Sequence, residues 1–447
     1  MIRISEIAPK IAAGKITSEK ITENCLATIT ELNPKLNAFI TVTADAALAR
    51  AREADKEIAA GRYLGTLHGI PISLKDLIDC KGTPTTAGSL VRKDVVAGSD
   101  APVTKYLRDA GAVFVGKTNL HEFAFGTTTE DSGFGLARNP HDPSRSPGGS
   151  SGGSAIAVAT GMSLGTVGTD TGGSIRIPAA ACGIVGLKPE WGRVSASGVV
   201  PLSRQLDHVG PLAASVADAW LLYNAMQEPA SRVSTLPETA SLKGLRFGRP
   251  AGYLFDRLDA DVEQTMVNTI EFLQRRGATV SDVQLPHSGD IATVYLHLVL
   301  ADAAAYHART LESRPQDYTP NVRLRLEMAR YVLAEDYIRA LRGKAIITKE
   351  VDRALHGVDV LICPALSIPA PPIGATTMPV KGGPEAVRTL MLRCTQPFNV
   401  SGHPAISLPC GKTPGGMPIG LQLVGPKGRT AALVQAALAV EKVLTEQ

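Results

Sequence analysis

The feature that most constrains the fold of this chain is a glycine- and serine-rich run interrupted by apolar segments. Residues 147–189 read PGGSSGGSAIAVATGMSLGTVGTDTGGSIRIPAAACGIVGLKP, so an apolar stretch separates two glycine-flanked serines, Ser150 and Ser174. Glycines beside a serine let backbone N–H groups approach a ligand closely, because glycine tolerates positive φ without a steric penalty. Two such turns in one segment indicate a nucleophile and a helper residue.

A single lysine lies upstream in the apolar stretch GIPISLKDLID. Lys75 has Leu74 and Leu77 as close neighbours, and the pattern predicts a buried strand over 70–74. A lysine in apolar surroundings loses its charge more readily and becomes a usable general base. A serine hydroxyl is a weak nucleophile until a neighbouring base removes its proton. Lys75, Ser150 and Ser174 therefore form a candidate catalytic set.

Each of these residues also has a structural explanation. Glycine/serine runs are most often flexible linkers, but a linker is not followed by the apolar AIAVA and a second glycine/serine turn. A lone lysine in a strand usually extends its amine to the surface, and here the order of the motifs favours the catalytic interpretation. None of the nine histidines lies in the serine-rich core, so a Ser-His-Asp arrangement has little support.

Two short motifs point elsewhere and are rejected. Residues 111–118 spell GAVFVGKT, which matches the phosphate-loop pattern, but the four middle residues read as a buried strand and not as an exposed loop. Residues 149–153 match GxSxG with Ser151 as its serine, yet a proline-rich loop precedes them where a nucleophile elbow requires a strand.

In order and spacing these motifs resemble the amidase signature family of serine hydrolases. The matching segments are SLKD, GGSSGGSA, GTDTGGSIRIPAA and GIVGLKP, with further likeness in GKTNLHEFAFGTTTEDSGFGLARNP, PFNVSGHPAISLPCG and PIGLQLVGP. The likeness covers most of the chain. It implies an α/β amidase signature fold, a large mixed β-sheet core flanked by α-helices on both faces.

The resemblance also implies roles for individual residues. Ser174 attacks the carbonyl, Ser150 relays the proton from a cis peptide, and Lys75 accepts it as a neutral amine. Oxyanion and substrate-binding positions follow from the same likeness: Thr171, Gly172, Gly173, Ser174, Ala124, Phe125 and Gly126. Structural support is assigned to Ser151 and to a buried ion pair between Asp170 and Arg176.

The implied activity is hydrolysis of a linear amide, or of a related aryl-amide, carbamate (urethane) or urea-type C–N bond, through an acyl-enzyme. Backbone donors meet the oxyanion, so no metal or organic cofactor is required, and the partner is a small-molecule substrate. One alternative is the glutaminase component of a tRNA-dependent amidotransferase, its A subunit, although VRLRLEMARYVLAEDYIRALR resembles stand-alone amidases more. Another is a catalytically inert binding scaffold. Substrate identity and oligomeric state stay open.

Composition agrees with a large α/β enzyme. The 447 residues are 44% hydrophobic and only 4% aromatic, and they include 43 glycines. We predict one amidase domain over 1–447, with the signature core at about 60–220 and a variable region at about 230–345 that shapes the substrate pocket. The net charge of +4 with no Lys/Arg block gives no reason to expect nucleic-acid or anionic-membrane binding.

The cysteines and the N-terminus predict a cytoplasmic protein. The six cysteines are scattered without a CxxC pair, which argues against a metal knuckle and a disulfide framework. His121-Glu122 lacks the second histidine of HExxH. The first 26 residues have helical periodicity and not the apolar core of a signal peptide. No stretch reaches the ~18 apolar residues that a membrane-spanning helix needs, so we expect no membrane span.

Periodicity predicts alternating strands and helices. Strands are expected at 70–74, 112–115, 279–283 and 358–362, and helices at 101–110, 152–160, 216–226, 259–276, 321–355 and 430–445. Regions 60–220 and 390–425 are expected to form the sheet core.

Overall fold

One mixed sheet of 11 strands runs through the molecule, in the order β1-β3-β2-β4-β6-β5-β12-β13-β9-β7-β8. This computed structural model describes residues 1–233 and 236–446. The strands are β1 Phe39–Val42, β2 Pro71–Lys75, β3 Val113–Thr118, β4 Gly165–Asp170, β5 Val185–Lys188, β6 His208–Ala213, β7 Arg246–Pro250, β8 Thr279–Val283, β9 Val360–Pro364, β12 Ala405–Lys412 and β13 Pro418–Val424. A separate two-stranded sheet pairs β10 Thr377–Met378 with β11 Glu385–Ala386.

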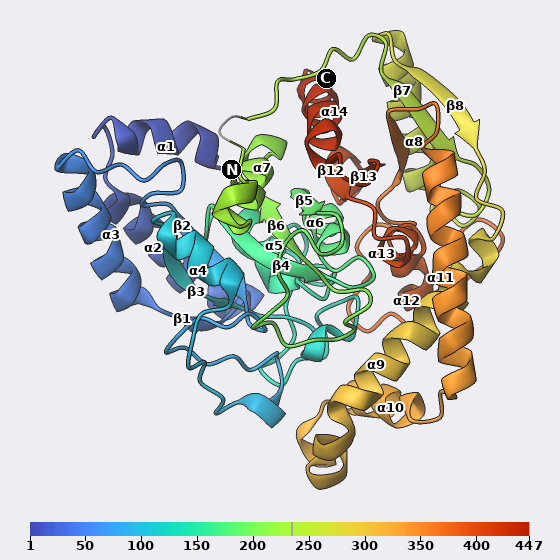
Figure 1. Ribbon diagram of the computed structural model, residues 1–447, viewed down its shortest axis with the longest axis horizontal. Helices are drawn as coiled ribbons and strands as arrows, with labels where there is room; N and C mark the ends of the chain where they lie inside the picture. Colours follow the sequence, from blue (N-terminus) through green and yellow to red (C-terminus); the bar gives the residue numbers. More distant parts are fainter. Residues whose placement is uncertain (234–235, 447) are drawn as a thin grey trace.

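Helices cover both faces of the large sheet (Figure 1). They are α1 Ile4–Ala12, α2 Ser18–Leu36, α3 Ala44–Ala59, α4 Pro102–Asp109, α5 Gly152–Ala159, α6 Arg176–Cys182, α7 Val216–Met226, α8 Ala260–Arg275, α9 Ile291–Ser313, α10 Pro320–Ala329, α11 Ala334–Ala354, α12 Val387–Arg393, α13 Gln396–Val400 and α14 Thr430–Leu444. Helices α5 and α6 contact each other and the central strands, whereas α7 and α14 form a second contacting pair on those strands. The α/β architecture expected from the sequence is confirmed.

The strands that lead to Lys75 and to the TGGS turn, β2 and β4, are buried along their whole length. β2 lies between β3 and β4 and is parallel to both, so the carboxyl ends of these strands meet at one edge. Every residue of β2 and β4 is buried. Lys75 ends β2, and the TGGS turn follows β4, which places both at this edge.

Several predicted elements match the structure closely. The strand expected at 279–283 is β8, and the helix expected at 216–226 is α7. The helix expected over 321–355 is wrong as a single element, because the chain breaks between α10 and α11. Leu333 there has extended φ and ψ of −76° and 150°, and the acidic pair Glu335 and Asp336 occupies the first turn of α11, where the helix dipole favours negative charge.

The sheet is wider than predicted. Residues outside 60–220 and 390–425 also contribute strands, namely β1, β7, β8 and β9. β9 pairs with β13, and β7 pairs with β9 and β8, so this part extends the sheet beyond the antiparallel β12–β13 pair. Much of β8 is exposed, and it lacks the alternating apolar pattern that marks a half-buried strand.

The phosphate-loop motif at 111–118 forms buried strand β3, as expected from its apolar middle residues. Lys117, the lysine of the motif, points into the protein. Its Nζ lies 3.1 Å from Asp76 Oδ1 and donates to Pro84 O at 3.0 Å. This lysine therefore serves a buried ion pair and is not presented to a phosphate.

One helical segment, Ser288–Ser313, is long and apolar enough to cross a membrane by length and composition alone. It contains the α9 helix, which packs against α10, α11 and α13 (Figure 1). Asp302 within it accepts a hydrogen bond from Ser203 at 2.6 Å. These contacts are those of a helix packed inside a folded protein. Such a core helix can be as long and as apolar as a membrane-spanning one.

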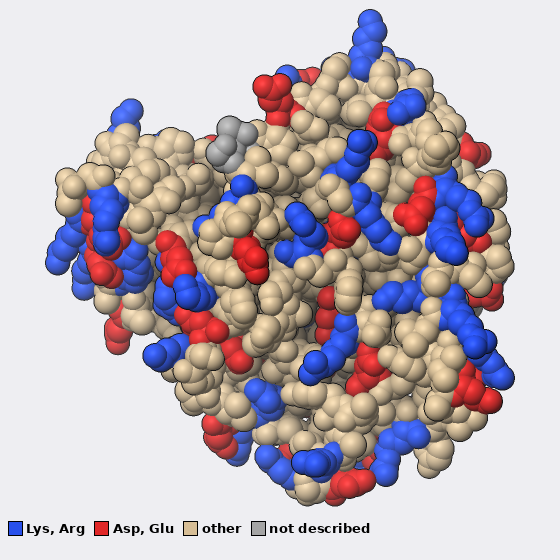
Figure 2. Space-filling model, viewed as in Figure 1, with Lys and Arg blue, Asp and Glu red and all other residues tan. Residues whose placement is uncertain are grey.

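Charged side chains of both signs are interspersed on the face shown in Figure 2. Many pair across one helical turn, as Lys105 does with Asp109 and Arg323 with Glu327. Exposed pairs of this kind stabilise a fold by at most about 1 kcal/mol each, so they contribute solubility more than stability.

Candidate active site

Lys75 is fully buried at the end of β2, and its amine faces two hydroxyl groups. Nζ lies 2.8 Å from Ser150 Oγ and 2.9 Å from Thr169 Oγ1. The alternation of β2 directs Ser73 and Lys75 to the same side of the sheet, where α5 packs against the strand. Thr169 was not singled out from the sequence, although it lies within the GTDTGGS motif.

Burial lowers the pKa of Lys75 to about 7, because desolvation disfavours the charged amine. The carboxylates of Asp170 and Asp207 act in the opposite direction and raise it. A lysine with this pKa is substantially neutral in mildly alkaline solution, and a neutral amine can accept a proton.

Ser150 is buried and follows a cis peptide bond between Gly149 and Ser150, as the family resemblance implies. Glycine is required at 149, because a Cβ there would lie 2.7 Å from Thr128 N. The carbonyl of Ser150 accepts a hydrogen bond from His121 N at 3.1 Å. The serine is therefore held from both sides before the chain enters α5.

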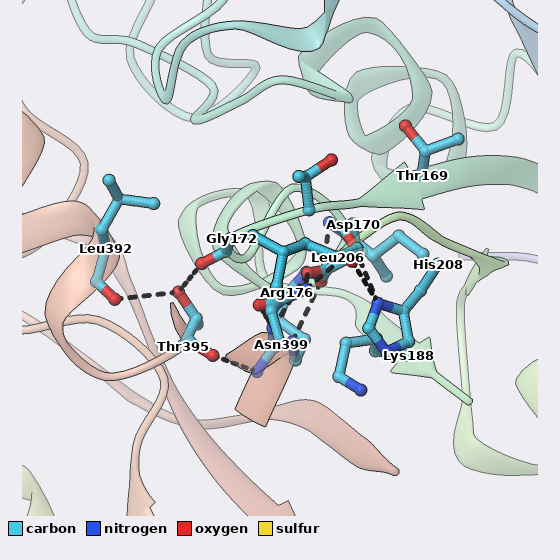
Figure 3. Close-up of polar contacts among 12 residues, drawn as sticks. Thr169, Asp170, Gly172, Arg176, Lys188, Leu206, His208, Leu392, Thr395 and Asn399 are labelled. Carbon is cyan, nitrogen blue, oxygen red and sulfur yellow. Dashed lines mark hydrogen bonds and ion pairs between the residues drawn. The ribbon is translucent and has the colours of Figure 1, made fainter. Parts of the chain in front are cut away.

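Ser174 lies in the turn between β4 and α6 and is 5% exposed. Its carbonyl accepts a hydrogen bond from Ser151 N at 3.3 Å, so the two serine turns are directly joined. Gly173 has φ +145°, and a Cβ there would lie 2.2 Å from Thr395 Oγ1. Thr395 donates to Gly172 O at 2.6 Å (Figure 3), which fixes the peptide orientation of the turn.

The predicted Asp170–Arg176 pair is present and buried, with Nη2 of Arg176 2.9 Å from Oδ1 of Asp170. Asn399 also donates to Asp170 Oδ1, at 2.7 Å (Figure 3). Arg176 Nη1 donates to Gln422 Oε1 at 2.6 Å. The Arg176 guanidinium holds the pKa of Asp170 well below its usual range. Asp170 Oδ2 accepts from Ile175 N at 3.1 Å, so the pair braces the TGGS turn.

Ser151 donates its hydroxyl to Thr169 O at 3.2 Å and is buried. Thr171 donates to Asp207 Oδ1 at 2.6 Å. Burial raises the pKa of Asp207 to about 6. Asp207 carries no motif signal in the sequence, and only the fold brings it beside the TGGS turn.

The segment 124–126 lies in the loop after β3, in a turn with positive φ at Phe123 and Ala124. The carbonyl of Phe125 accepts a hydrogen bond from Arg325 Nη1 at 2.7 Å. Gly126 has no room for a side chain, because a Cβ there would lie 2.0 Å from His121 Nε2. The turn is thus tightly fixed next to the residue that binds the Ser150 carbonyl.

Comparison with known proteins decides the family. The Amidase family model matches residues 20–434. The chain belongs to the amidase signature family. A solved structure described as an amidase has a TM-score of 0.94 at 37% identity and covers 99% of this chain and 100% of its own. The peptide amidase of Stenotrophomonas maltophilia has a TM-score of 0.86 at 30% identity, covering 99% of this chain and 97% of its own.

A second kind of amidase-family relative is equally extensive. The A subunit of the glutamyl-tRNA(Gln) amidotransferase of Chloroflexus aurantiacus is 40% identical over 98% of this chain and 95% of its own length.

Among residues 1–233 and 236–446, no group of three or more His, Cys, Asp or Glu side chains could hold a metal ion.

Proposed function

We propose that this chain is an amidohydrolase that cleaves a linear amide, or a related carbamate or urea-type C–N bond, through an acyl-enzyme on Ser174. The observation that carries the proposal is the contact between the buried Lys75 amine and Ser150 Oγ at 2.8 Å. Ser150 sits on the turn that is joined to the Ser174 turn through Ser151 N. A Ser-Ser-Lys relay needs this order of groups.

Acylation begins when neutral Lys75 takes the proton of Ser150 and Ser150 takes that of Ser174. The Ser174 oxygen then forms a bond to the carbonyl carbon, and the carbonyl π electrons move to its oxygen. Backbone N–H groups of Thr171, Gly172, Gly173 and Ser174 stabilise this oxyanion, at about 3–4 kcal/mol for a well-placed donor. Protonated Lys75 returns the proton through Ser150 to the leaving nitrogen as the C–N bond breaks. Water repeats the sequence to release the acid.

The second candidate is the glutaminase component of an amidotransferase, and the 40% identity to the A subunit from Chloroflexus supports it. Both candidates use the same acyl-enzyme chemistry and differ in the acyl donor and in the need for partner subunits. Hydrolysis of glutamine compared with other primary amides by the isolated chain separates them. A glutaminase component is expected to favour glutamine by at least about tenfold in kcat/KM, a difference of about 1.4 kcal/mol.

Fluorophosphonate labelling followed by peptide mass spectrometry tests the proposal and distinguishes it from an inert scaffold. We expect a single adduct on Ser174 in the wild type and none in Ser174→Ala, with both proteins folded to the same melting temperature within a few degrees. Ser150→Ala should slow labelling less than Ser174→Ala, because water can partly replace a relay but not the nucleophile. An adduct on another serine would overturn the assignment.

A further inference from the structure

The TGGS turn between β4 and α6 leaves its backbone donors free. None of the N–H groups of residues 171–174 donates to another part of the chain that the structure describes, although all four residues are buried. The next N–H group, that of Ile175, donates to Asp170 Oδ2 at 3.1 Å. Buried N–H groups are almost always hydrogen-bonded in native proteins, so an unpaired row of them is prepared for a ligand.

Thr395, in the segment between α12 and α13, holds one of the carbonyl groups of this turn. Its hydroxyl donates to Gly172 O at 2.6 Å (Figure 3). The other contact of the hydroxyl, with Leu392 O, is longer at 3.3 Å, so its single proton lies on the Gly172 bond. The C=O and N–H of a trans peptide point in opposite directions, so a donor that fixes the Gly172 carbonyl also fixes the Gly173 N–H.

The hydroxyl of Thr395 is packed directly against the turn. A Cβ on Gly173, whose φ is +145°, would lie 2.2 Å from Thr395 Oγ1 and 2.6 Å from Ile177 Cδ1. Thr395 is itself 0% exposed. Removal of the hydroxyl therefore leaves the Gly172 carbonyl without this donor in a closed space, where an unmade hydrogen bond is costly.

Thr395 is fixed in turn by the buried Asp170–Arg176 pair. Arg176 Nη1 donates to Thr395 O at 3.0 Å, while its Nη2 lies 2.9 Å from Asp170 Oδ1. Asn399 follows four residues after Thr395 and donates to Asp170 O at 2.9 Å, which fixes the peptide that carries the Thr171 N–H in the same way. One short segment of the chain thus holds both ends of the turn.

We propose that Thr395 is a positioning residue of the reaction, which turns the Gly173 N–H toward the oxygen of the substrate carbonyl and holds it there. The inference rests on the proposed function, in which the N–H groups of the turn stabilise the oxyanion. A donor that is oriented in advance needs no reorganisation when the negative charge develops. The hydrogen bond from Thr395 also polarises the Gly172–Gly173 peptide, which makes its N–H a stronger donor.

Saturation kinetics of fluorophosphonate labelling test the proposal, because they separate binding (KI) from bond formation (kinact). Thr395→Val removes the hydroxyl and keeps the shape of the side chain. We expect kinact to fall by about 10- to 100-fold, less than for outright loss of an oxyanion donor, with KI unchanged. Thr395→Ser keeps a hydroxyl and should restore most of kinact.

Thr104→Val is the matched control. Thr104 on α4 is also buried, and its hydroxyl donates to the carbonyl of Asp79 at 2.7 Å. This control should lower the melting temperature as Thr395→Val does and leave kinact at the wild-type value. Should valine at 395 prevent folding, Thr395→Ala takes its place, because it removes the hydroxyl without placing a methyl group against Gly173.

The pH dependence of kinact gives a second readout. The base is untouched in Thr395→Val, so the acidic limb should stay where it is in the wild type and only the plateau should fall. A shifted limb, a wild-type kinact in Thr395→Val, or a loss that Thr395→Ser does not restore would overturn the inference.

Labelling of the wild type keeps the two levels of argument apart. If Ser174 is not labelled, the proposed function fails. If Ser174 is labelled at a rate that does not depend on the Thr395 hydroxyl, only this inference fails.

Discussion

At the scale of single residues, Lys75 has the most demanding chemistry. Its amine must be neutral before Ser174 attacks, and burial favours the neutral form because desolvation lowers the pKa of the amine. The free side chain has a pKa of about 10.4, and burial in this site lowers it to about 7. Hydroxyl partners at 2.8 and 2.9 Å, with no carboxylate in direct contact among the described residues, let that shift persist.

We expect kcat/KM for an amide to rise with pH through about 7 and then level off, because Lys75 is active only after it loses its proton. Lys75→Met keeps the apolar stem without the base. It should cut amide hydrolysis steeply and remove the acidic limb, while esters lose less because an alkoxide leaves with less help. A Lys75→Met profile like that of the wild type, with chemistry limiting the rate, would contradict the assignment.

A substitution at Asp207 should shift the acidic limb of the pH profile of kcat/KM while leaving the base, Lys75, in place. The negative charge of Asp207 raises the pKa of Lys75, so Asp207→Asn should lower that pKa and shift the acidic limb of the pH–rate profile to lower pH. The asparagine keeps an oxygen for the Thr171 hydroxyl, but its amide nitrogen faces Leu202 N, which donates to Asp207 Oδ2 at 3.0 Å, so some loss of stability is expected beside the pKa change. The measurement is the same profile of kcat/KM, and a shift to higher pH would show that Asp207 does not act on Lys75 through its charge.

The sequence singled out the residues proposed for this site but missed part of their surroundings. Lys75, Ser150 and Ser174 stand in motifs whose residue types reveal their chemistry, and Asp170 with Arg176 forms the expected buried pair. Thr169 and Asp207 were missed. Thr169 lies within the GTDTGGS motif, but only the pairing of β4 with β2 brings its hydroxyl to Lys75. Asp207 contacts Thr171 only because the fold brings the two together, and nothing in its local sequence indicates this contact.

At the scale of elements, the turn between β4 and α6 fixes the geometry of the nucleophile. We predict that Gly173→Ala abolishes Ser174 labelling and destabilises the protein by more than Gly161→Ala does. Gly161 has φ +77°, near the left-handed helical region that costs an alanine about 1–2 kcal/mol, and no atom lies within 4 Å of the added Cβ. Gly173 has φ +145°, a conformation that is essentially restricted to glycine, and an added Cβ there would clash. Denaturant unfolding and labelling rates measure the difference, and equal effects of the two substitutions would refute it.

A second element contact links the active-site loop to the helices of the variable region. The buried Glu122 accepts from Ser89 Oγ at 2.5 Å, and from Thr319 N at 2.8 Å just before α10. Glu122→Gln keeps an oxygen for Thr319 N, but it removes the negative charge that strengthens both bonds and makes the Ser89 hydroxyl accept instead of donate, so kcat/KM should fall by about tenfold, as expected for weakened charge-assisted hydrogen bonds. Glu327→Gln, exposed on α10, is the matched control and should behave as wild type.

Element boundaries were predictable where local chemistry sets them. Asp259 accepts from Asp261 N at the start of α8, and α7 begins with Ser215 as its cap, so both helices were placed to within about a residue. The break between α10 and α11 was missed because neither proline nor glycine marks it. Leu333 takes its extended conformation from the packing of the two helices on α9, which is a tertiary effect.

At the scale of the whole molecule, the β12–β13 pair is the junction of the sheet. β12 pairs with β5 of the serine-rich core, and β13 pairs with β9, so two halves of the chain share one continuous hydrogen-bonded sheet. The buried Arg176–Gln422 contact crosses the same junction. Residues far beyond the signature core therefore support the turn that carries Ser174.

We predict from this continuity that residues 1–447 unfold as one cooperative unit. Hydrogen exchange measured by mass spectrometry along a denaturant series should give the same midpoint for peptides covering β4 and for peptides covering β9, because neither half can open without breaking the β12–β13 pairing. Gln422→Leu, which removes the partner of Arg176 Nη1 in the buried core, should lower both midpoints together. Separate midpoints for β4 and β9 would instead show two independently folding units and would refute the single-domain prediction.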